Sequence, residues 1–381
     1  MSLAGALGLY IHWPYCARIC PYCDFNVYRP KGAEDALLAA IRDDMRGWRE
    51  RTGARRLTSL HFGGGTPSLL SASALQQLIE AADTVWGFVE QPEIGLEANP
   101  NDGEAFGDYA SVGINRLSVG VQSFDPQALD RLGRDHSASE AVAAVERARS
   151  AVDQVSLDLI YAWHGQSLAH WQGELRRAVE LGVGHVSPYQ LTIESGTAFG
   201  KRAERGDRLA LEPDDAADFY AVTDQALGEA GFERYEISNH ARDAAAQSTH
   251  NRLYWEGGDW IGIGPGAHGR LGTHSHTGRI ATEAARRPGD YIDQVAETGW
   301  GVGSLETLSA ADERTERVLM GMRLAAGLDL AQVADFTGLG IDEAECRRMI
   351  ELGYVERDQT RLKLTREGQL LGDGVSMALI P

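Results

Sequence analysis

The sequence predicts an α/β fold, namely a partial (βα)6 TIM-like barrel followed by a small C-terminal winged-helix-like α+β domain. Two observations support this prediction. Short apolar runs alternate with helical segments six times between residues 7 and 230, and strands separated by helices pair in parallel through right-handed crossovers. The last part of the chain shows three helices and a β-hairpin instead. We therefore expect a barrel domain at 1–303 and a second domain at 304–381.

The six predicted strands are short apolar runs. They lie at 7–12, 57–62, 93–98, 116–122, 155–161 and 185–192. Between them, apolar residues recur at helical spacing, which is typical of helices that pack on a sheet. These helices are expected at 34–48, 71–85, 102–112, 126–132, 137–150, 167–181 and 214–230. Ser71 is the expected N-cap of the second helix.

The pattern loosens after the sixth unit. Residues 235–276 are rich in glycine and contain five of the 11 histidines, and we assign them to the barrel domain. These histidines are His240, His250, His268, His274 and His276. Residues 298–303 are expected to form a linker. Beyond it, helices are expected at 310–324, 330–336 and 342–352, a hairpin at 354–357 and 361–365, and a last helix.

Composition excludes several classes of partner. The 381 residues carry a formal net charge of −19, which argues against a nucleic-acid footprint and against attraction to anionic lipid. Winged-helix domains can bind DNA, but residues 305–381 hold nine Lys and Arg against 14 Asp and Glu. No apolar run is long enough to span a bilayer, and the first residues do not resemble a signal peptide. We expect a cytoplasmic protein in a reducing compartment.

Three of the four cysteines, Cys16, Cys20 and Cys23, fall within eight positions, and Cys346 lies far away. Three thiolates can hold three irons of a cubane iron–sulfur cluster and leave the fourth iron open for a small ligand. A structural zinc site favours four ligands in two pairs, which this spacing does not supply. His12 as a fourth ligand is a weaker alternative, and Cys346 is expected to be a buried thiol.

Polar residues recur at the ends of the apolar strands. Glu97 ends the third strand, Gln122 ends the fourth, and Asp158 lies within the fifth. The carboxyl ends of strands face the active site in a βα barrel, so these residues favour a shared ligand site. The glycine-rich loop Gly63–Pro67 follows the second strand and lets backbone amides approach a ligand. Arg134, taken alone, is expected to be a solvated arginine.

The segment His250–Trp255 combines a histidine with aromatic residues in the loosened region. Histidine can ligate heme iron, and aromatic rings can stack on a macrocycle. Composition alone favours the alternative, which is a histidine that is hydrogen-bonded inside a folded loop.

The C-x3-C-x2-C spacing of the three cysteines resembles the radical S-adenosylmethionine superfamily. The string Tyr10–Cys16 is similar to the branch that contains oxygen-independent coproporphyrinogen III oxidase and the HemW-type heme chaperones. The resemblance covers nearly the whole chain. It includes the segments Gly63–Pro67, Glu97–Pro100, Gly120–Phe124, Asp158–Tyr161 and Gly262–Gly269.

The resemblance implies that Cys16, Cys20 and Cys23 bind a 4Fe–4S cluster whose open iron is chelated by S-adenosylmethionine. It implies that residues of the first strand, the glycine-rich loop and the third strand surround the nucleotide, namely Tyr10, Gly64, Gly65, Thr66 and Glu97. It also implies that four further residues contact S-adenosylmethionine, some of them at a second molecule, namely Tyr22, Gln122, Arg134 and Asp158. An arginine suits the carboxylate of this ligand, and an acidic residue suits its ammonium or its ribose hydroxyls.

Two features separate this chain from the oxidase. The oxidase pattern has a further cysteine two residues after the third, where this sequence has Phe25, and it has a longer N-terminal extension. The Cys-Asp-Phe string is typical of the HemW group instead. So is a motif that the group associates with heme binding, formed here by His250, Asn251, Tyr254 and Trp255. The resemblance thus reverses the interpretation of His250 from composition.

The resemblance implies a heme chaperone that transfers heme to acceptor hemoproteins, among them respiratory enzymes that it meets at the membrane. The alternative is an enzyme of the coproporphyrinogen oxidase type, which oxidatively decarboxylates porphyrinogen propionates. Whether S-adenosylmethionine is cleaved in normal function is left open by the sequence, as is a homodimer.

Overall fold

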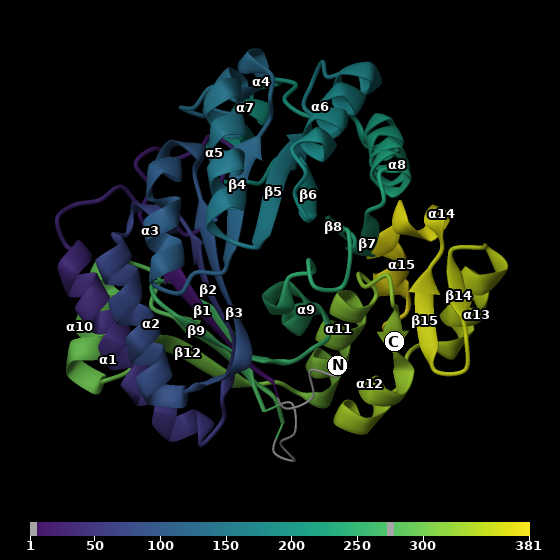
Figure 1. Cartoon of the computed structure of the whole chain (residues 1–381). Helices are drawn as coiled ribbons and strands as arrows, with labels where there is room; N and C mark the ends of the chain where they lie inside the picture. Colours follow the sequence, from purple (N-terminus) through teal and green to yellow (C-terminus); the bar gives the residue numbers. More distant parts are fainter. Residues whose placement is uncertain (1–5, 273–277) are drawn as a thin grey trace.

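The computed structural model describes residues 6–272 and 278–381 (Figure 1). Within these residues, twelve strands form one open sheet in the order β12-β11-β10-β9-β1-β2-β3-β4-β5-β6-β8-β7. The predicted α/β architecture is confirmed, because the six predicted strands pair in parallel. These strands are β1 (Leu7–Trp13), β2 (Leu57–Gly64), β3 (Phe88–Ala98), β4 (Arg116–Gln122), β5 (Gln154–Tyr161) and β6 (His185–Gln190).

Helices connect these strands and cover the outer face of the curved sheet (Figure 1). They are α1 (Glu34–Thr52), α2 (Ala72–Trp86), α3 (Phe106–Ser111), α4 (Pro126–Arg131), α5 (Ala138–Ala151), α6 (Leu168–Glu180) and α8 (Pro213–Glu229), with α7 (Ala198–Ala203) as an unpredicted short helix. Ser71 caps α2 as predicted, since its hydroxyl accepts a hydrogen bond from Ala74 N at 3.2 Å. No helix of the described residues has the length and apolar character needed to cross a bilayer.

The loosened region extends both edges of the sheet. Next to β6 lie the antiparallel strands β8 (Asn239–Ala241) and β7 (Glu233–Glu236). On the other edge, β9 (Asp259–Ile263) pairs in parallel with β1, which adds a parallel strand that the sequence pattern did not predict. The antiparallel strands β10 (His268–Leu271), β11 (Ile280–Ala284) and β12 (Val302–Thr307) follow it, and α9 (Thr249–Trp255) packs against β2 and β9. The predicted histidine region extends beyond the described residues, since His274 and His276 lie outside them.

The expected linker at 298–303 is wrong. Helix α10 (Pro288–Thr298) ends at Gly299, which has a left-handed conformation with φ of 72°, and β12 begins at Val302. Between them, Gly301 N donates a 3.0 Å hydrogen bond to Asp44 Oδ1, a buried carboxylate of α1. The glycines that suggested a flexible segment instead allow a tight turn against α1.

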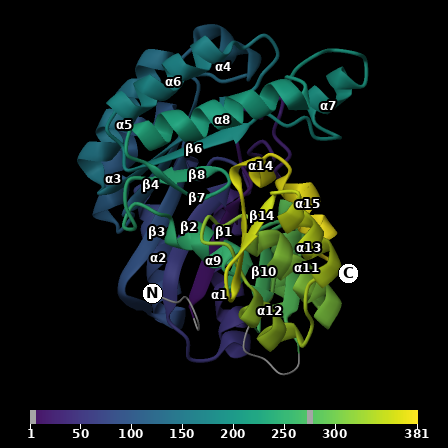
Figure 2. The ribbon, with the colours of Figure 1, turned by 90° about the vertical axis from the view of Figure 1, so that its right-hand side faces the viewer.

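The last part of the chain forms a compact unit with its own hydrophobic core. Its elements are α11 (Ala310–Gly321), β13 (Leu328–Asp329), α12 (Leu330–Thr337), α13 (Glu343–Glu351), β14 (Val355–Arg357), β15 (Arg361–Leu364), α14 (Arg366–Gln369) and α15 (Gly372–Ala378). Cys346 is fully buried in this core, as expected. Figure 2 shows the unit below α8. The division between the domains at 303/304 stays a proposal. Strand β12 crosses this position.

Candidate functional site

The three clustered cysteines lie in the loop that leaves the carboxyl end of β1. Two backbone hydrogen bonds hold this loop closed, from Cys16 N to the Tyr28 oxygen at 2.9 Å and from Tyr28 N to the Pro14 oxygen at 2.7 Å. Cys16 is buried and the other two thiols are half-buried. Cys16, Cys20 and Cys23 all line one cavity of about 390 Å³, so the structure brings the predicted ligands together.

The thiols fit a cluster better than a single ion. No group of three histidine, cysteine, aspartate or glutamate side chains among the described residues is arranged to hold one metal ion. A zinc site needs its ligands around one centre, whereas a cubane cluster takes one thiolate per iron. Burial raises the pKa of Cys16 and raises the pKa of Cys23 to about 11. In the metal-free protein Cys16 and Cys23 are therefore thiols at neutral pH, and binding of a cluster by these two residues releases their protons.

The glycine loop after β2 forms the neighbouring wall of this cavity. Gly64 has φ of 106°, and a Cβ there would lie 2.4 Å from His12 Cε1. A Cβ on Gly65 would lie 2.7 Å from the Tyr15 oxygen, and Thr66 N donates to that oxygen at 2.9 Å. These glycines are therefore required by the close packing of the loop against β1 and the cysteine segment.

Three strands bring their predicted polar residues to the same cavity. Glu97 of β3 accepts a hydrogen bond from Gly64 N at 3.0 Å. Gln122, at the end of β4, has φ of 64°, a conformation that costs a residue other than glycine about 1–3 kcal/mol and concentrates at ligand sites. Asp158 of β5 accepts a 2.9 Å hydrogen bond from Ser118 Oγ, and burial raises the pKa of Asp158 to about 7.

Arg134 connects the cysteine loop to the barrel. Its guanidinium donates to Asn99 Oδ1, to the Gly120 oxygen at 3.1 Å, and to Cys20 Sγ at 3.5 Å. Its Nε is buried without a hydrogen-bond partner among the described residues. Tyr22 lines the same cavity, and burial raises its pKa. Arg134 is thus a positioned cation with a spare donor, which suits an anionic ligand group, and the prediction of a solvated arginine is wrong.

Sequence reasoning did not single out several polar residues of this cavity, among them Asn99 and Ser118. Asn99 follows β3 and receives the Arg134 donor, and Ser118 holds the carboxylate of Asp158. Ser118 lies between two apolar residues of β4. A lone hydroxyl in a buried strand is the signal that could have identified it.

The α9 segment lies away from this cavity, in the barrel core. His250 is 1% exposed, and both of its ring nitrogens are hydrogen-bonded, Nδ1 to Ser59 Oγ at 3.0 Å and Nε2 to the Tyr254 hydroxyl at 2.7 Å. Its ring stacks on His61 with the ring centroids 4.9 Å apart. In this arrangement neither nitrogen is free to ligate iron. Heme ligation by His250 stays a prediction that requires these bonds to open.

Tyr10 packs against the rings of His61 and His250, and it does not line the cavity. Its ring stacks on His61 with centroids 6.3 Å apart, and its hydroxyl lies 3.1 Å from His12 Nδ1. His61 Nε2 in turn lies 3.5 Å from Glu97 Oε1, and Glu97 lines the cavity, so these stacked rings connect to it. The other residues of the motif, Asn251 and Trp255, do not line the cavity either.

The pKa of Asp158 gives a testable pH dependence. We expect the affinity for S-adenosylmethionine to fall about tenfold between pH 8 and pH 6, because protonation removes the carboxylate that we propose as the acceptor of the ligand's hydrogen bonds. Isothermal titration calorimetry on the cluster-loaded protein under anaerobic conditions measures this change. Asp158→Asn should bind S-adenosylmethionine weakly, and its affinity should depend little on pH. Asp153→Asn, a control at an exposed position, should keep the pH dependence of the unaltered protein. An unchanged profile in Asp158→Asn would contradict the assignment.

Comparisons with known proteins show which family the chain resembles. The chain matches the Radical SAM superfamily over residues 10–178 and the HemN C-terminal domain over residues 308–371. It is 36% identical to the heme chaperone HemW of Mycobacterium tuberculosis, with 98% of this chain and 94% of that protein covered. HemW of Escherichia coli (strain K12) is also 36% identical, with coverage of 96% and 95%.

A mouse relative, the mitochondrial radical S-adenosyl methionine domain-containing protein 1, is 35% identical over 100% of this chain and 88% of its own length. Among solved structures, the coproporphyrinogen III oxidase HemN of Escherichia coli superposes with a TM-score of 0.83 at 22% identity, and 98% of this chain and 90% of that chain are covered. That likeness shows the fold. The superfamily implies a 4Fe–4S cluster and S-adenosylmethionine, and the residues of the cavity fit both. By its near-full-length identity to these relatives, the chain belongs to the HemW family of the radical S-adenosylmethionine superfamily.

Proposed function

We propose that this protein is a heme chaperone that holds a 4Fe–4S cluster with S-adenosylmethionine at the barrel mouth and transfers heme to acceptor hemoproteins. The observation that carries the proposal is the 32–36% identity, over nearly the full chain, to bacterial proteins named heme chaperone HemW. Phe25 supports it, because the oxidase pattern has cysteine at that position. Phe25 is 60% exposed beside the cysteines and offers no thiol to the cavity.

In this proposal the residues of the cavity bind and orient the cofactors. Cys16, Cys20 and Cys23 hold the cluster, Arg134 receives the carboxylate of S-adenosylmethionine, and Asp158 accepts its hydrogen bonds. A reduced cluster held by these cysteines would supply the electron for cleavage of S-adenosylmethionine, the chemistry typical of this superfamily.

Heme binding is the direct test. We expect the purified, cluster-loaded protein to form a stable complex with hemin at about one heme per chain, because the family relatives are heme chaperones. The Soret absorbance during titration, followed by gel filtration, measures the complex and its stoichiometry. An unrelated acidic protein of similar size, titrated with hemin in the same buffer, controls for nonspecific heme binding. Loss of the heme on the column at micromolar protein concentration would overturn the proposed function.

The enzyme alternative shares the fold of HemN, so it is tested on the same anaerobic sample. We expect coproporphyrinogen III to be recovered unchanged after incubation with S-adenosylmethionine and a reductant. Formation of protoporphyrinogen IX, followed by fluorescence after oxidation, would instead make the protein an oxidative decarboxylase.

A further inference from the structure

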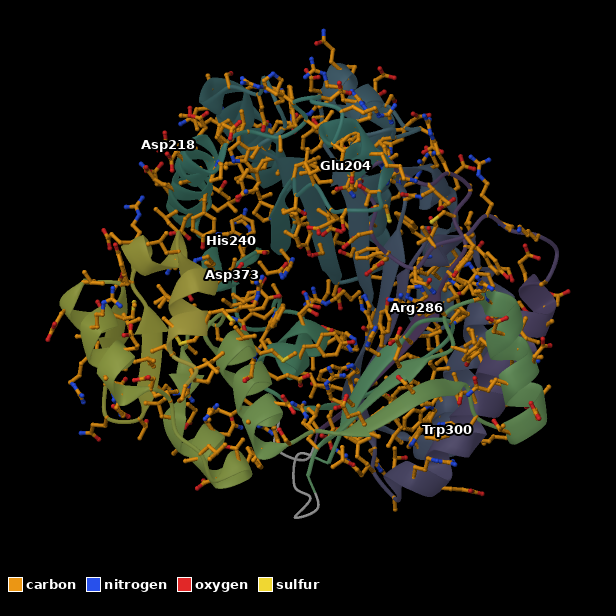
Figure 3. All side chains as sticks on the ribbon, turned by 180° about the vertical axis from the view of Figure 1, so that it is seen from behind. Glu204, Asp218, His240, Arg286, Trp300 and Asp373 are labelled. Atoms are coloured by element: carbon orange, nitrogen blue, oxygen red, sulfur yellow. The ribbon has the colours of Figure 1, made fainter. Side chains whose placement is uncertain are left out.

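The histidine motif and the cluster cavity meet at the second strand. Ser59 and His61 lie two residues apart on β2, so their side chains lie on the same face of the sheet. Both contact His250, Ser59 through the 3.0 Å hydrogen bond to Nδ1 and His61 through its ring, whose plane is 14° from that of His250. Figures 1 and 3 show α9, which carries His250, on the inner side of the curved sheet, between His240 of β8 and Arg286, which follows β11. Strand β2 therefore holds the predicted heme ligand through two neighbouring side chains.

Two glycines leave the space that the His61 ring and its neighbours occupy. Gly95 pairs with His61 across β2 and β3, and a Cβ on Gly95 would lie 2.6 Å from His61 Nδ1. A Cβ on Gly63 would lie 2.8 Å from Tyr10 Cε2 and 2.9 Å from Glu97 Oε1. A side chain at either position would displace the His61 ring or the Glu97 carboxylate, so both strands need glycine there.

Glu97 connects the His61 ring to the cavity. Its Oε2 accepts the 3.0 Å hydrogen bond from Gly64 N, and its Oε1 lies 3.5 Å from His61 Nε2. The Glu97 side chain is 39% exposed and lines the cavity, whereas the His61 side chain is 12% exposed. His61 Nδ1 is buried without a hydrogen-bond partner among the described residues. The contact with Glu97 is therefore what orients the polar edge of the His61 ring.

We infer that His61 is a positioning residue that couples the cluster cavity to His250, an inference that rests on the proposed function. A hydroxyl or ammonium group of S-adenosylmethionine in the cavity competes with His61 for Glu97 Oε1. When Glu97 turns to the ligand, both nitrogens of the His61 ring are left without a partner inside the barrel, which favours rotation of the ring away from His250. His250 is then held by its two hydrogen bonds without the stacked ring, and it is released to heme iron more easily.

Binding of heme through His250 and binding of S-adenosylmethionine therefore favour each other. The affinity for heme should rise about fivefold when S-adenosylmethionine is bound, which is the size that one aromatic stacking contact contributes. The affinity for S-adenosylmethionine should rise by the same factor when heme is bound, because coupling between two sites is reciprocal. Departure of S-adenosylmethionine then weakens the hold on heme, which favours its transfer.

Hemin titration with and without saturating S-adenosylmethionine tests the coupling. The anaerobic, cluster-loaded protein is used with its cluster oxidised, so that S-adenosylmethionine stays intact, and the Soret band reports the bound heme. The unaltered protein should bind heme about fivefold more tightly with S-adenosylmethionine. His61→Phe keeps a flat ring against His250 and removes the nitrogen that faces Glu97, so it should bind heme with the same affinity in both conditions.

His170→Phe is the matched control. His170 Nε2 lies 3.7 Å from Asp125 Oδ2, and its ring packs on Trp163 with the centroids 5.7 Å apart, so this histidine makes the same two kinds of contact away from the cavity. His170→Phe should keep the fivefold effect of S-adenosylmethionine. Circular dichroism and the iron content of the reconstituted cluster establish that each variant is folded.

A second variant moves the His61 ring without changing its chemistry. In Gly95→Ala the added Cβ displaces the ring, so the affinity for heme without S-adenosylmethionine should reach the value that the unaltered protein has with it. If the unaltered protein binds no heme, the proposed function fails. If it binds heme equally well with and without S-adenosylmethionine, if His61→Phe keeps the full effect, or if Gly95→Ala binds heme like the unaltered protein, His61 does not couple the two sites.

Discussion

Cys20→Ala is expected to abolish assembly of the iron–sulfur cluster while the protein stays folded. The cubane cluster uses one thiolate for each of three irons, and removal of one ligand leaves two, which do not retain it. Cys20 is half-buried in a loop, so the substitution removes little packed surface. Iron and sulfide analysis and the visible absorbance after anaerobic reconstitution should show near-complete loss of the cluster. Binding of S-adenosylmethionine should be lost with it, because the ligand chelates the open iron.

Cys346→Ala is the matched control for this prediction. Cys346 is fully buried in the C-terminal core, and its Sγ lies 3.9 Å from Arg357 Nη1, far in the fold from the cluster loop. Its substitution should reduce stability by about 1–2 kcal/mol through lost packing and leave the iron content unchanged. A cluster that assembles normally in Cys20→Ala, or that is lost in Cys346→Ala, would refute the ligand assignment.

Arg116→Met is expected to reduce the free energy of unfolding by about 3–5 kcal/mol, because it leaves a buried carboxylate without its cation. Arg116 Nε donates to Glu93 Oε2 at 2.8 Å, and the two side chains are 4% and 9% exposed. Arg116 Nη2 also donates to the carbonyl oxygens of Ala246 and Gln247, at 2.9 and 3.0 Å. Urea unfolding followed by circular dichroism measures the loss.

The same carboxylate holds the start of α9. Glu93 accepts hydrogen bonds from Ser248 Oγ at 3.1 Å, Thr249 N at 2.8 Å and His250 N at 2.9 Å, which satisfies amides at the helix N-terminus. We therefore expect amide hydrogen exchange over 248–255 to accelerate in Arg116→Met more than elsewhere in the barrel. The double variant with Glu93→Gln should recover part of the stability, since the charge left unpaired is removed.

The exposed ion pair of Arg46 with Asp43 gives the comparison for Arg116. Its side chains are 71% and 56% exposed, so Arg46→Met should change stability by less than about 0.5 kcal/mol. Equal effects of Arg46→Met and Arg116→Met would mean that the buried network does not stabilise the barrel as argued.

Local signals predicted the fold well where a segment's own pattern decides its structure. Strand β4 has the predicted bounds, and Ser71 caps α2 as expected, because short apolar runs and helix caps depend on near neighbours in sequence. Strand β9 was missed because its parallel pairing with β1 joins residues about 250 positions apart. The prediction of a linker at 298–303 was wrong. Glycines lower the propensity for helix and strand, but here they permit a tight turn against the buried Asp44.

By itself the sequence determined the cluster loop and the family, since the spacing of Cys16, Cys20 and Cys23 and the position of Phe25 lie within ten residues. Only the tertiary structure decided the place of His250. A histidine beside aromatic residues suits a heme ligand and a core network equally well, and its partner Ser59 is remote in sequence. Burial and the satisfaction of both ring nitrogens arise when α9 packs against β2, and this contact depends on the whole barrel being folded.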